Sequence, residues 1–130
     1  MTVNSFTSVS LEPAWITVAL RKATRTHSLI VRAGTFAVTI LAAGQEHVSQ
    51  RFAGQGDYQE DRFAGLETAT LLTGAPLFGG GLAWLDCRVV QTVTAGENSL
   101  FVGEVLAARG EFLGQPLIYH HRQYWGLLAV

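Results

Sequence analysis

Apolar and polar residues alternate along several stretches of the chain, and this pattern predicts a protein built mainly from β-strands. These stretches are rich in valine, isoleucine, threonine and aromatic residues, which favour extended backbone. Strands are predicted at residues 14–20, 35–42, 82–94, 100–109 and 116–119. Residues 95–98, Ala-Gly-Glu-Asn, predict a hairpin turn that pairs the third of these strands with the fourth.

The longest predicted strand, residues 82–94, has two faces, because successive side chains of a strand point to opposite sides. One face carries Ala83, Leu85, Cys87 and Val89. The other face carries Trp84, Asp86, Arg88 and Val90. In the partner strand, we expect Glu104 to lie on a polar face.

Two short helices are also predicted. Residues 27–33 follow Thr24 and Thr26, either of which can cap a helix, and Gly34 stands just past the end. Residues 45–52 place Val48 and Phe52 one turn apart on an apolar face. Five or so strands with two small helices indicate a β-barrel rather than a βαβ fold.

Residues 53–81 form a long span with no clear periodicity and many glycines, including the run at 79–81. Loops of this length are uncommon in compact domains and often serve a function. We therefore expect this span to form a lid or to contact a partner.

The composition narrows the class of protein. The chain has 130 residues, which suits one domain, and 48% of them are apolar against 15% charged. We infer that a homodimer interface or a bound cofactor covers part of the apolar surface. No apolar run approaches the roughly 20 residues of a membrane helix, and no basic segment precedes an apolar one as in a secretory signal. A net charge of −1 without a basic block argues against nucleic acid as the main partner.

Cys87 is the single cysteine, so no disulfide can form within the chain. A reducing, cytoplasmic location is the default expectation for such a chain. Because Cys87 alternates with Leu85 and Val89, we interpret it as a buried apolar side chain rather than a nucleophile.

Several kinds of active site are not supported by the motifs. His120 and His121 are adjacent and would point to opposite faces of a strand, and no CxxC, HExxH or similar spacing indicates a metal. GxSxG is absent, which argues against a catalytic serine. GxGxxG is absent as well, and there is no βαβ context for a Rossmann cofactor site.

Two polar segments are better candidates for binding. In residues 1–10, Thr2 and Asn4 would share one face of an extended strand, and a tight turn at residues 5–8 would offer hydroxyls and N–H groups to an anion or a polar ring. Thr24, Arg25 and Thr26 lie at a predicted helix N-terminus, which favours a phosphate. The alternatives are a disordered Ser/Thr-rich terminus and an ordinary capped helix with a solvated arginine.

The chain resembles the flavin reductase-like family with the FMN-binding split barrel, in eight segments that occur in the family's order. They are residues 1–13, Arg25-Thr26-His27, Phe36-Ala37-Val38-Thr39-Ile40-Leu41, Gln50-Arg51-Phe52-Ala53-Gly54, Gly74-Ala75-Pro76-Leu77, Leu82-Ala83-Trp84-Leu85-Asp86-Cys87, Phe101-Val102-Gly103-Glu104-Val105 and Pro116-Leu117-Ile118-Tyr119-His120. Each motif is weak alone, but together they cover essentially the whole chain.

The resemblance implies one domain over residues 1–130, mainly β, with a Greek-key-like split β-barrel and two or three short helices. It implies a short-chain NAD(P)H:flavin oxidoreductase that passes a hydride to FMN or FAD. Members are typically homodimers and often supply reduced flavin to a separate monooxygenase. No metal, membrane or nucleic acid is expected.

The family pattern also assigns roles to residues. It implies that the isoalloxazine and ribityl groups of the flavin contact Thr2, Asn4, Ser5, Ser8, Val9 and Ser10. It implies a phosphate contact from Thr24, Arg25 and Thr26, with Ala53 nearby. His120 and Tyr124 would lie where the nicotinamide of NADH or NADPH docks, and His120 is the candidate catalytic residue.

Three features depart from the family pattern. Members usually carry a helix and a first strand before the segment that begins here at Met1, so we expect either a misassigned start or a shortened N-terminus with an open barrel edge. Glu97-Asn98 replaces a frequent Asp-His in the hairpin, and residues 121–124, His-Arg-Gln-Tyr, replace Arg-Gly-Arg-Tyr. These departures leave two alternatives: a flavoprotein that binds FMN without reductase activity, and a truncated, non-catalytic homologue.

Overall fold

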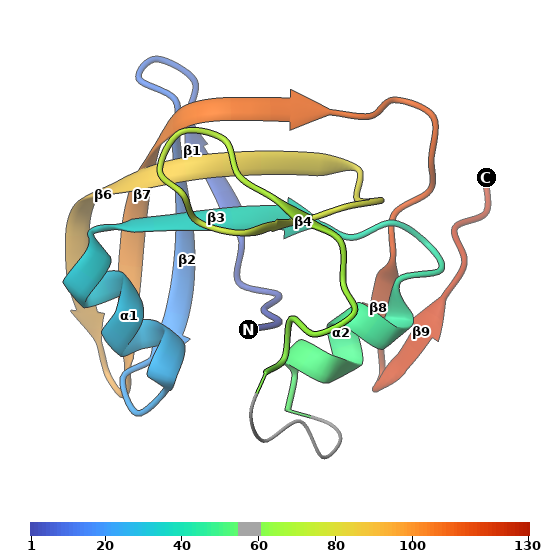
Figure 1. The fold of residues 1–130 in the computed structure, drawn as a ribbon, viewed down its shortest axis with the longest axis horizontal. Helices are drawn as coiled ribbons and strands as arrows, with labels where there is room; N and C mark the ends of the chain where they lie inside the picture. Colours follow the sequence, from blue (N-terminus) through green and yellow to red (C-terminus); the bar gives the residue numbers. More distant parts are fainter. Residues whose placement is uncertain (55–60) are drawn as a thin grey trace.

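A five-stranded antiparallel sheet, in the order β1-β2-β7-β6-β3, forms the centre of the protein (Figure 1). The computed structural model describes residues 1–54 and 61–130. The strands of this sheet are β1 (Thr7–Ser10), β2 (Trp15–Arg21), β3 (Thr35–Ile40), β6 (Ala83–Ala95) and β7 (Asn98–Gly110). Two small sheets pair β4 (Thr68–Ala69) with β5 (Leu77–Phe78) and β8 (Ile118–His120) with β9 (Gln123–Trp125). The helices of the described chain are α1 (Arg25–Ala33) and α2 (Glu46–Phe52). The prediction of a mainly β protein with short helices is confirmed.

The β6–β7 hairpin is the longest pairing in the sheet. Its register runs from Ala83 opposite Gly110 to Ala95 opposite Asn98, with bulges that bend it near Asp86 and Val89. Gly96 has φ +59°, the left-handed conformation that tight hairpin turns require, so the predicted turn is confirmed.

The two predicted faces of β6 are confirmed as well. Cys87 belongs to the buried core, and Leu85 and Val89 pack against that core. Trp84 and Asp86 face the segment that precedes β6, to which both are hydrogen-bonded. Glu104 of β7 lies on a polar face, as predicted, where it forms an ion pair with Arg88 directly across the strands.

The main core lies between the sheet and α1. It consists of Ile16, Val18, Leu20, Ile30, Phe36, Cys87 and Phe101. The residues of β2 alternate between buried and half-buried positions, which is the pattern of a strand with one face on a core. Helix α1 contributes Ile30 from its apolar face, and thereby covers one end of the sheet.

Helix α1 begins two residues earlier than predicted because Thr24, rather than Thr26, is its N-cap. The Thr24 hydroxyl accepts a hydrogen bond from the His27 N–H, which satisfies one free donor of the first turn. The helix ends at Gly34, which has φ +69° and donates its N–H to the carbonyl of Ile30.

Helix α2 packs beside a separate aromatic cluster. Val48 and Phe52 are buried, as their spacing predicted. The Phe52 ring lies 4.8 Å from the ring of Phe78 and 5.1 Å from that of Phe63, measured between centroids. This cluster attaches the segment that carries β4 and β5 to α2.

The N-terminal segment differs from its prediction. Residues 1–6 form no strand, and β1 begins only at Thr7, where the predicted tight turn was centred. Thr7 pairs with Thr17 and Ser8 with Ile16, so these residues are extended. Thr2 instead donates its N–H to the carbonyl of Phe52 in α2. Thr2 and Asn4 therefore do not share the face of a strand, because residues 1–6 pair with no strand and the Thr2 N–H bonds to a helix end instead.

The C-terminal strand is also shifted, and its partner was not predicted. Pro116 makes only an isolated bridge with Ala42, and β8 begins at Ile118. His121 has φ +52° and lies in the turn between β8 and β9, so the expectation that His120 and His121 face opposite sides of one strand is wrong.

The long irregular span is held in place where the structure describes it; residues 55–60 lie outside the described part. The N–H of Phe78 donates to the Thr39 hydroxyl, and the Gln45 side chain donates to the carbonyl of Gly79. The N–H groups of Leu72 and Thr73 both donate to Asp86. These bonds fasten residues 72–79 to β3, to β6 and to Gln45 just before α2, and give no sign of a lid in this part.

No helix in the described part of the chain is long and apolar enough to cross a membrane.

Gly103→Ala is expected to destabilise the protein by about 1–2 kcal/mol, because a Cβ there would stand 2.6 Å from the Phe36 ring and 3.1 Å from the Cβ of Cys87. Gly110→Ala, on the same strand, is the matched control, since its added Cβ meets no atom within 4 Å. Urea denaturation of both variants measures the difference. Equal stability would contradict the tight packing of β7 on Phe36.

Candidate functional site

A cavity of about 560 Å³ opens between residues 1–6, β3, α2 and the β8–β9 hairpin. Cofactor and substrate sites commonly have roughly this volume, with an apolar wall and a few polar groups. The apolar wall includes Val38, Val48, Phe52, Phe78 and Leu117. The polar side chains of the lining are Thr2, Asn4, Thr39, Ser49, Tyr119 and Tyr124.

Ser49 links three parts of this cavity. Its carbonyl accepts a hydrogen bond of 2.6 Å from the Thr2 hydroxyl, and its own hydroxyl lies 3.0 Å from the hydroxyl of Tyr124, which donates to it. Ser49 is buried, so these polar groups are largely removed from water. The network therefore fixes the N-terminal segment and β9 against α2, and gives the cavity a defined shape.

Tyr124→Phe and Ser49→Ala are each expected to lower the free energy of unfolding by about 0.5–1.5 kcal/mol, since each removes the same hydrogen bond. The double variant should lower the free energy of unfolding by no more than the larger of the two single variants does, because the two residues share one hydrogen bond. Tyr119→Phe is the control, as the Tyr119 hydroxyl bonds to no described residue. A double-mutant cycle by thermal denaturation measures this coupling, and additive effects would contradict it.

The flavin reductase-like domain model matches residues 1–127 of the chain. The chain belongs to this family. Its predicted membership is thus confirmed, and the match extends over nearly the whole sequence.

The NADH:FAD oxidoreductase of Streptomyces globisporus superposes with a TM-score of 0.91 at 30% identity, over 97% of this chain and 76% of that one. The flavin reductase of the styrene monooxygenase of Pseudomonas putida superposes with a TM-score of 0.82 at 32% identity, over 98% of this chain and 80% of that one. The predicted split-barrel fold is therefore confirmed.

A curated relative from Rhizobium meliloti, the reductase subunit of stachydrine N-demethylase, is 38% identical over 86% of this chain. The chain spans 47% of the length of that relative, and 33% of the length of a second curated relative from the same organism.

The cavity of this flavin reductase-like domain brings together four of the residues assigned from the family pattern. Thr2 and Asn4 line it from the N-terminal segment, Ala53 from the end of α2, and Tyr124 from β9. These residues come from three distant parts of the sequence.

Four other residues assigned to the flavin lie outside the cavity lining. Ser8, Val9 and Ser10 are residues of β1. The Ser5 hydroxyl both donates to the carbonyl of Ala19 and accepts from its N–H, so it extends the hydrogen bonding of the sheet instead of pointing a free group at the cavity.

The predicted phosphate residues lie at the start of α1 and do not line the cavity. Thr24 uses its hydroxyl twice within the chain, as the N-cap and as a donor to the carbonyl of Arg21. Arg25 and Thr26 begin the helix, and Arg25 is exposed. The nearby Arg21 is paired with Glu97 of the hairpin turn, 3.3 Å away, so it is not an unpaired cation of this region.

His120 is outside the cavity lining, and its neighbour Tyr119 is inside it. The backbone carbonyl of His120 accepts a hydrogen bond from the Trp125 indole, which closes the β8–β9 hairpin. The ring of Tyr119 lies 5.1 Å from that of Tyr124 across the two strands. Sequence reasoning missed Tyr119 because the register of β8 was unknown.

Ser49 and Thr39 were also missed. Both carry a sequence signal: Ser49 is polar beside Val48 on the apolar side of α2, and Thr39 interrupts the apolar run of β3. Each uses its oxygen as an acceptor, Ser49 for Tyr124 and Thr39 for the Phe78 N–H.

The titratable groups near the sheet are structural. Cys87 is fully buried, and burial together with the charge of Asp86 raises the pKa of its thiol to about 12, so the interpretation as a core side chain is confirmed.

Among the described residues, no group of three or more His, Cys, Asp and Glu side chains is placed to hold a metal ion.

Proposed function

We propose that this domain is an NAD(P)H-dependent flavin reductase that transfers a hydride from a reduced nicotinamide to FMN or FAD. The observation that carries the proposal is the 560 Å³ cavity in which Thr2, Asn4, Ala53 and Tyr124 meet, in a chain of the flavin reductase-like family. The names of two relatives support the reaction: one is an NADH:FAD oxidoreductase and one a flavin reductase.

The lining suits a flat ring system with apolar faces and a polar rim. Val38 and Phe52 provide an apolar surface, and Asn4 and Thr2 provide amide and hydroxyl groups at one edge. Asn4 is exposed and forms no hydrogen bond with the described residues, so its amide is available to a ligand. When bound, the flavin supplies the redox chemistry, and the protein supplies position and electrostatics.

The chain's own residues bind and orient the two reactants. Thr2 and Asn4 hold the polar edge of the flavin ring. Ser5 follows them with its hydroxyl bonded to Ala19, and Ser8, Val9 and Ser10 lie in β1, next along the chain. Thr24 caps α1, and Arg25 and Thr26 in its first turn bind the phosphate, outside the cavity that Ala53 lines. Tyr124 and His120 border the nicotinamide, with Tyr124 placed in the cavity wall by Ser49. Alignment of two rings in one cavity needs no protein nucleophile.

The reduced flavin is released to a monooxygenase, and the protein acts as a homodimer. The styrene monooxygenase reductase and the demethylase reductase subunit are, by their names, components that serve a second enzyme. Exposed apolar side chains, among them Leu11, Phe112 and Leu113, support a dimer surface. Sedimentation at micromolar concentration tests the dimer, and a monomer would contradict it.

Stopped-flow absorbance is the decisive experiment for the reaction. Flavin added to the protein should bleach when NADH or NADPH is mixed in under anaerobic conditions, and FMN and FAD are compared in turn. Flavin that stays bound through gel filtration without consuming either nucleotide would favour a non-reductase flavoprotein. Failure to bind any flavin would favour a non-catalytic homologue.

A further inference from the structure

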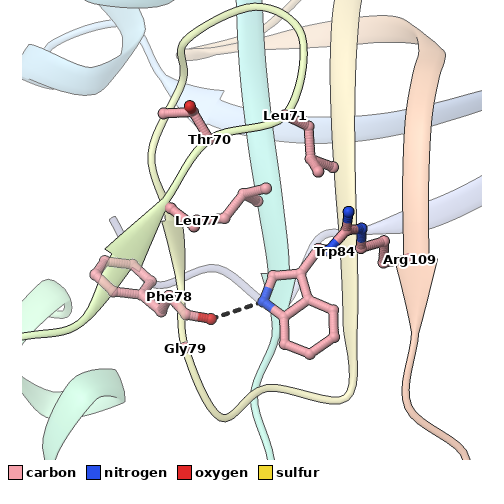
Figure 2. A pocket seen from close by; sticks show the side chains of 8 residues that line it. Thr70, Leu71, Leu77, Phe78, Gly79, Trp84 and Arg109 are labelled. Atoms are coloured by element: carbon pink, nitrogen blue, oxygen red, sulfur yellow. Dashed lines mark hydrogen bonds between the residues drawn. The ribbon is translucent and has the colours of Figure 1, made fainter.

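A second cavity, of about 210 Å³, lies on the face of β6 that carries Trp84, beneath the segment that holds β4 and β5 (Figure 2). Leu71, Leu77, Phe78 and Trp84 are the large apolar residues of its lining. Thr70 and Arg109 are polar lining residues, and both are exposed. Figure 2 shows Leu71 and Leu77 extending from the loop toward Trp84 and Arg109, which come from β6 and β7. This cavity takes no part in the proposed reaction.

The walls of this cavity are fixed by hydrogen bonds before any ligand arrives. The Trp84 indole N–H donates to the carbonyl of Phe78 over 2.6 Å, which sets the plane of the indole. The buried carboxylate of Asp86 accepts the N–H groups of Leu72 and Thr73, each over 2.7 Å, directly beside Leu71. A cavity with walls held in this way requires little ordering on binding, which favours affinity.

The chemistry of the lining is apolar with one positive charge. Leu77 is buried, and the indole of Trp84 has already used its only donor. Arg109 faces Trp84 across the strands, and within the described chain its guanidinium forms no ion pair or hydrogen bond. Glu67 packs against Gly79 but does not line the cavity.

We propose that this cavity binds a small aromatic carboxylate. The ring would lie between Trp84 and the two leucines, and the carboxylate would accept two hydrogen bonds from Arg109, a geometry that suits a guanidinium. An apolar cavity of about 150 Å³ suffices for a benzene ring, so 210 Å³ accommodates a ring with one substituent. A neutral ligand would leave the arginine unused, and a phosphate would leave the apolar wall unused.

The site is separate from the larger cavity, although Phe78 lines both. Binding at this cavity can be measured in protein without flavin, so its failure and the failure of the proposed reductase activity are distinguishable. Flavin-free and flavin-saturated protein are therefore both titrated, which also prevents a ligand in the larger cavity from being mistaken for one in this site.

The experiment is a titration of the full chain with benzoate, followed by the NMR signal of the Trp84 indole N–H. Benzyl alcohol is the neutral analogue and acetate is the carboxylate without a ring. Arg109→Gln removes the charge at nearly constant size, and Arg32→Gln, at an exposed position in the last turn of α1, is the matched control.

We expect benzoate to shift the Trp84 signal with a dissociation constant on the order of 1 mM, the range reached by ligands of this size. Arg109→Gln should weaken binding by about tenfold or more, and Arg32→Gln should not change it. Benzyl alcohol and acetate should each bind at least several-fold more weakly than benzoate. An unmoved Trp84 signal, equal binding by Arg109→Gln and native protein, or benzyl alcohol binding as tightly as benzoate would overturn the proposal.

Discussion

Asp86→Ala is expected to lower the free energy of unfolding by about 2–4 kcal/mol, the scale for leaving several buried donors without an acceptor. Asp86 is fully buried, and its carboxylate accepts hydrogen bonds from the Leu72 N–H, the Thr73 N–H and the Thr73 hydroxyl. No lysine or arginine pairs with it in the described chain. Its charge is therefore stabilised by hydrogen bonds from one loop, and removing it releases that loop from β6.

Urea denaturation of the native protein and of Asp86→Ala measures this effect. Asp61→Ala is the control, because Asp61 is exposed and, among the described residues, its carboxylate accepts one hydrogen bond, from the Phe63 N–H. A change within about 0.5 kcal/mol is expected there. If Asp86→Ala lowered the free energy of unfolding no more than Asp61→Ala does, the position of the loop would not depend on the Asp86 carboxylate.

The same residue predicts the direction of a pH effect. Burial alone would raise the pKa of Asp86, but the hydrogen bonds from Thr73, Leu72 and the Cys87 N–H outweigh it and hold the pKa below its usual value. A carboxyl with a lowered native pKa stabilises the fold fully above its unfolded pKa of about 3.9. This contribution is lost as pH falls through the native pKa. Between pH 7 and pH 3, native protein should therefore lose more stability than Asp86→Ala, and parallel losses would contradict this assignment.

The elements that could be predicted from the sequence are those whose signals are local. One continuous stretch contains the alternation along β6, the turn at Gly96 and the return along β7. The position of the hairpin and the two faces of β6 were therefore predicted correctly. The signals for the N-cap at Thr24 and for the end of the helix at Gly34 are also local. The sequence left open only whether Thr24 or Thr26 is the N-cap.

The parts that could not be predicted depend on contacts between distant residues. The hydroxyl of Thr2 bonds to Ser49, 47 positions away, and this contact rather than strand pairing sets the path of the first residues. Similarly, Asp86 could be placed on the face of β6 opposite Cys87, but its hydrogen-bond partners come from residues 72–73 of a loop without periodicity.

The candidate site was predicted in part for the same reason. Thr2, Asn4, Ala53 and Tyr124 line one cavity, but the position of Tyr119 rather than His120 in its wall follows from the register of β8 with β9. That register depends on His121 and Arg122, which both adopt a positive φ in the turn, a conformation that the sequence of two long side chains does not suggest.

Arg25→Ala is expected to weaken FMN binding by about 1–3 kcal/mol, which is roughly 5- to 150-fold, the usual scale for a lost charge-assisted hydrogen bond. Arg25 begins α1, where N–H groups without helical partners favour a phosphate, and its exposed guanidinium forms no ion pair in the described chain. The cavity lined by Thr2 and Asn4 does not include it, so the phosphate would have to extend beyond that cavity.

Riboflavin, which has the same ring system without the phosphate, separates the two parts of the site. Fluorescence titrations should show that Arg25→Ala weakens FMN binding but leaves riboflavin binding unchanged. Asn4→Ala, in the cavity, should weaken both ligands equally, because it acts on the ring they share. Arg32→Ala, an exposed arginine at the opposite end of α1, should affect neither ligand. If FMN and riboflavin bind native protein equally well, or if Arg25→Ala leaves FMN affinity unchanged, then α1 does not bind the phosphate, and the flavin is held by the cavity alone.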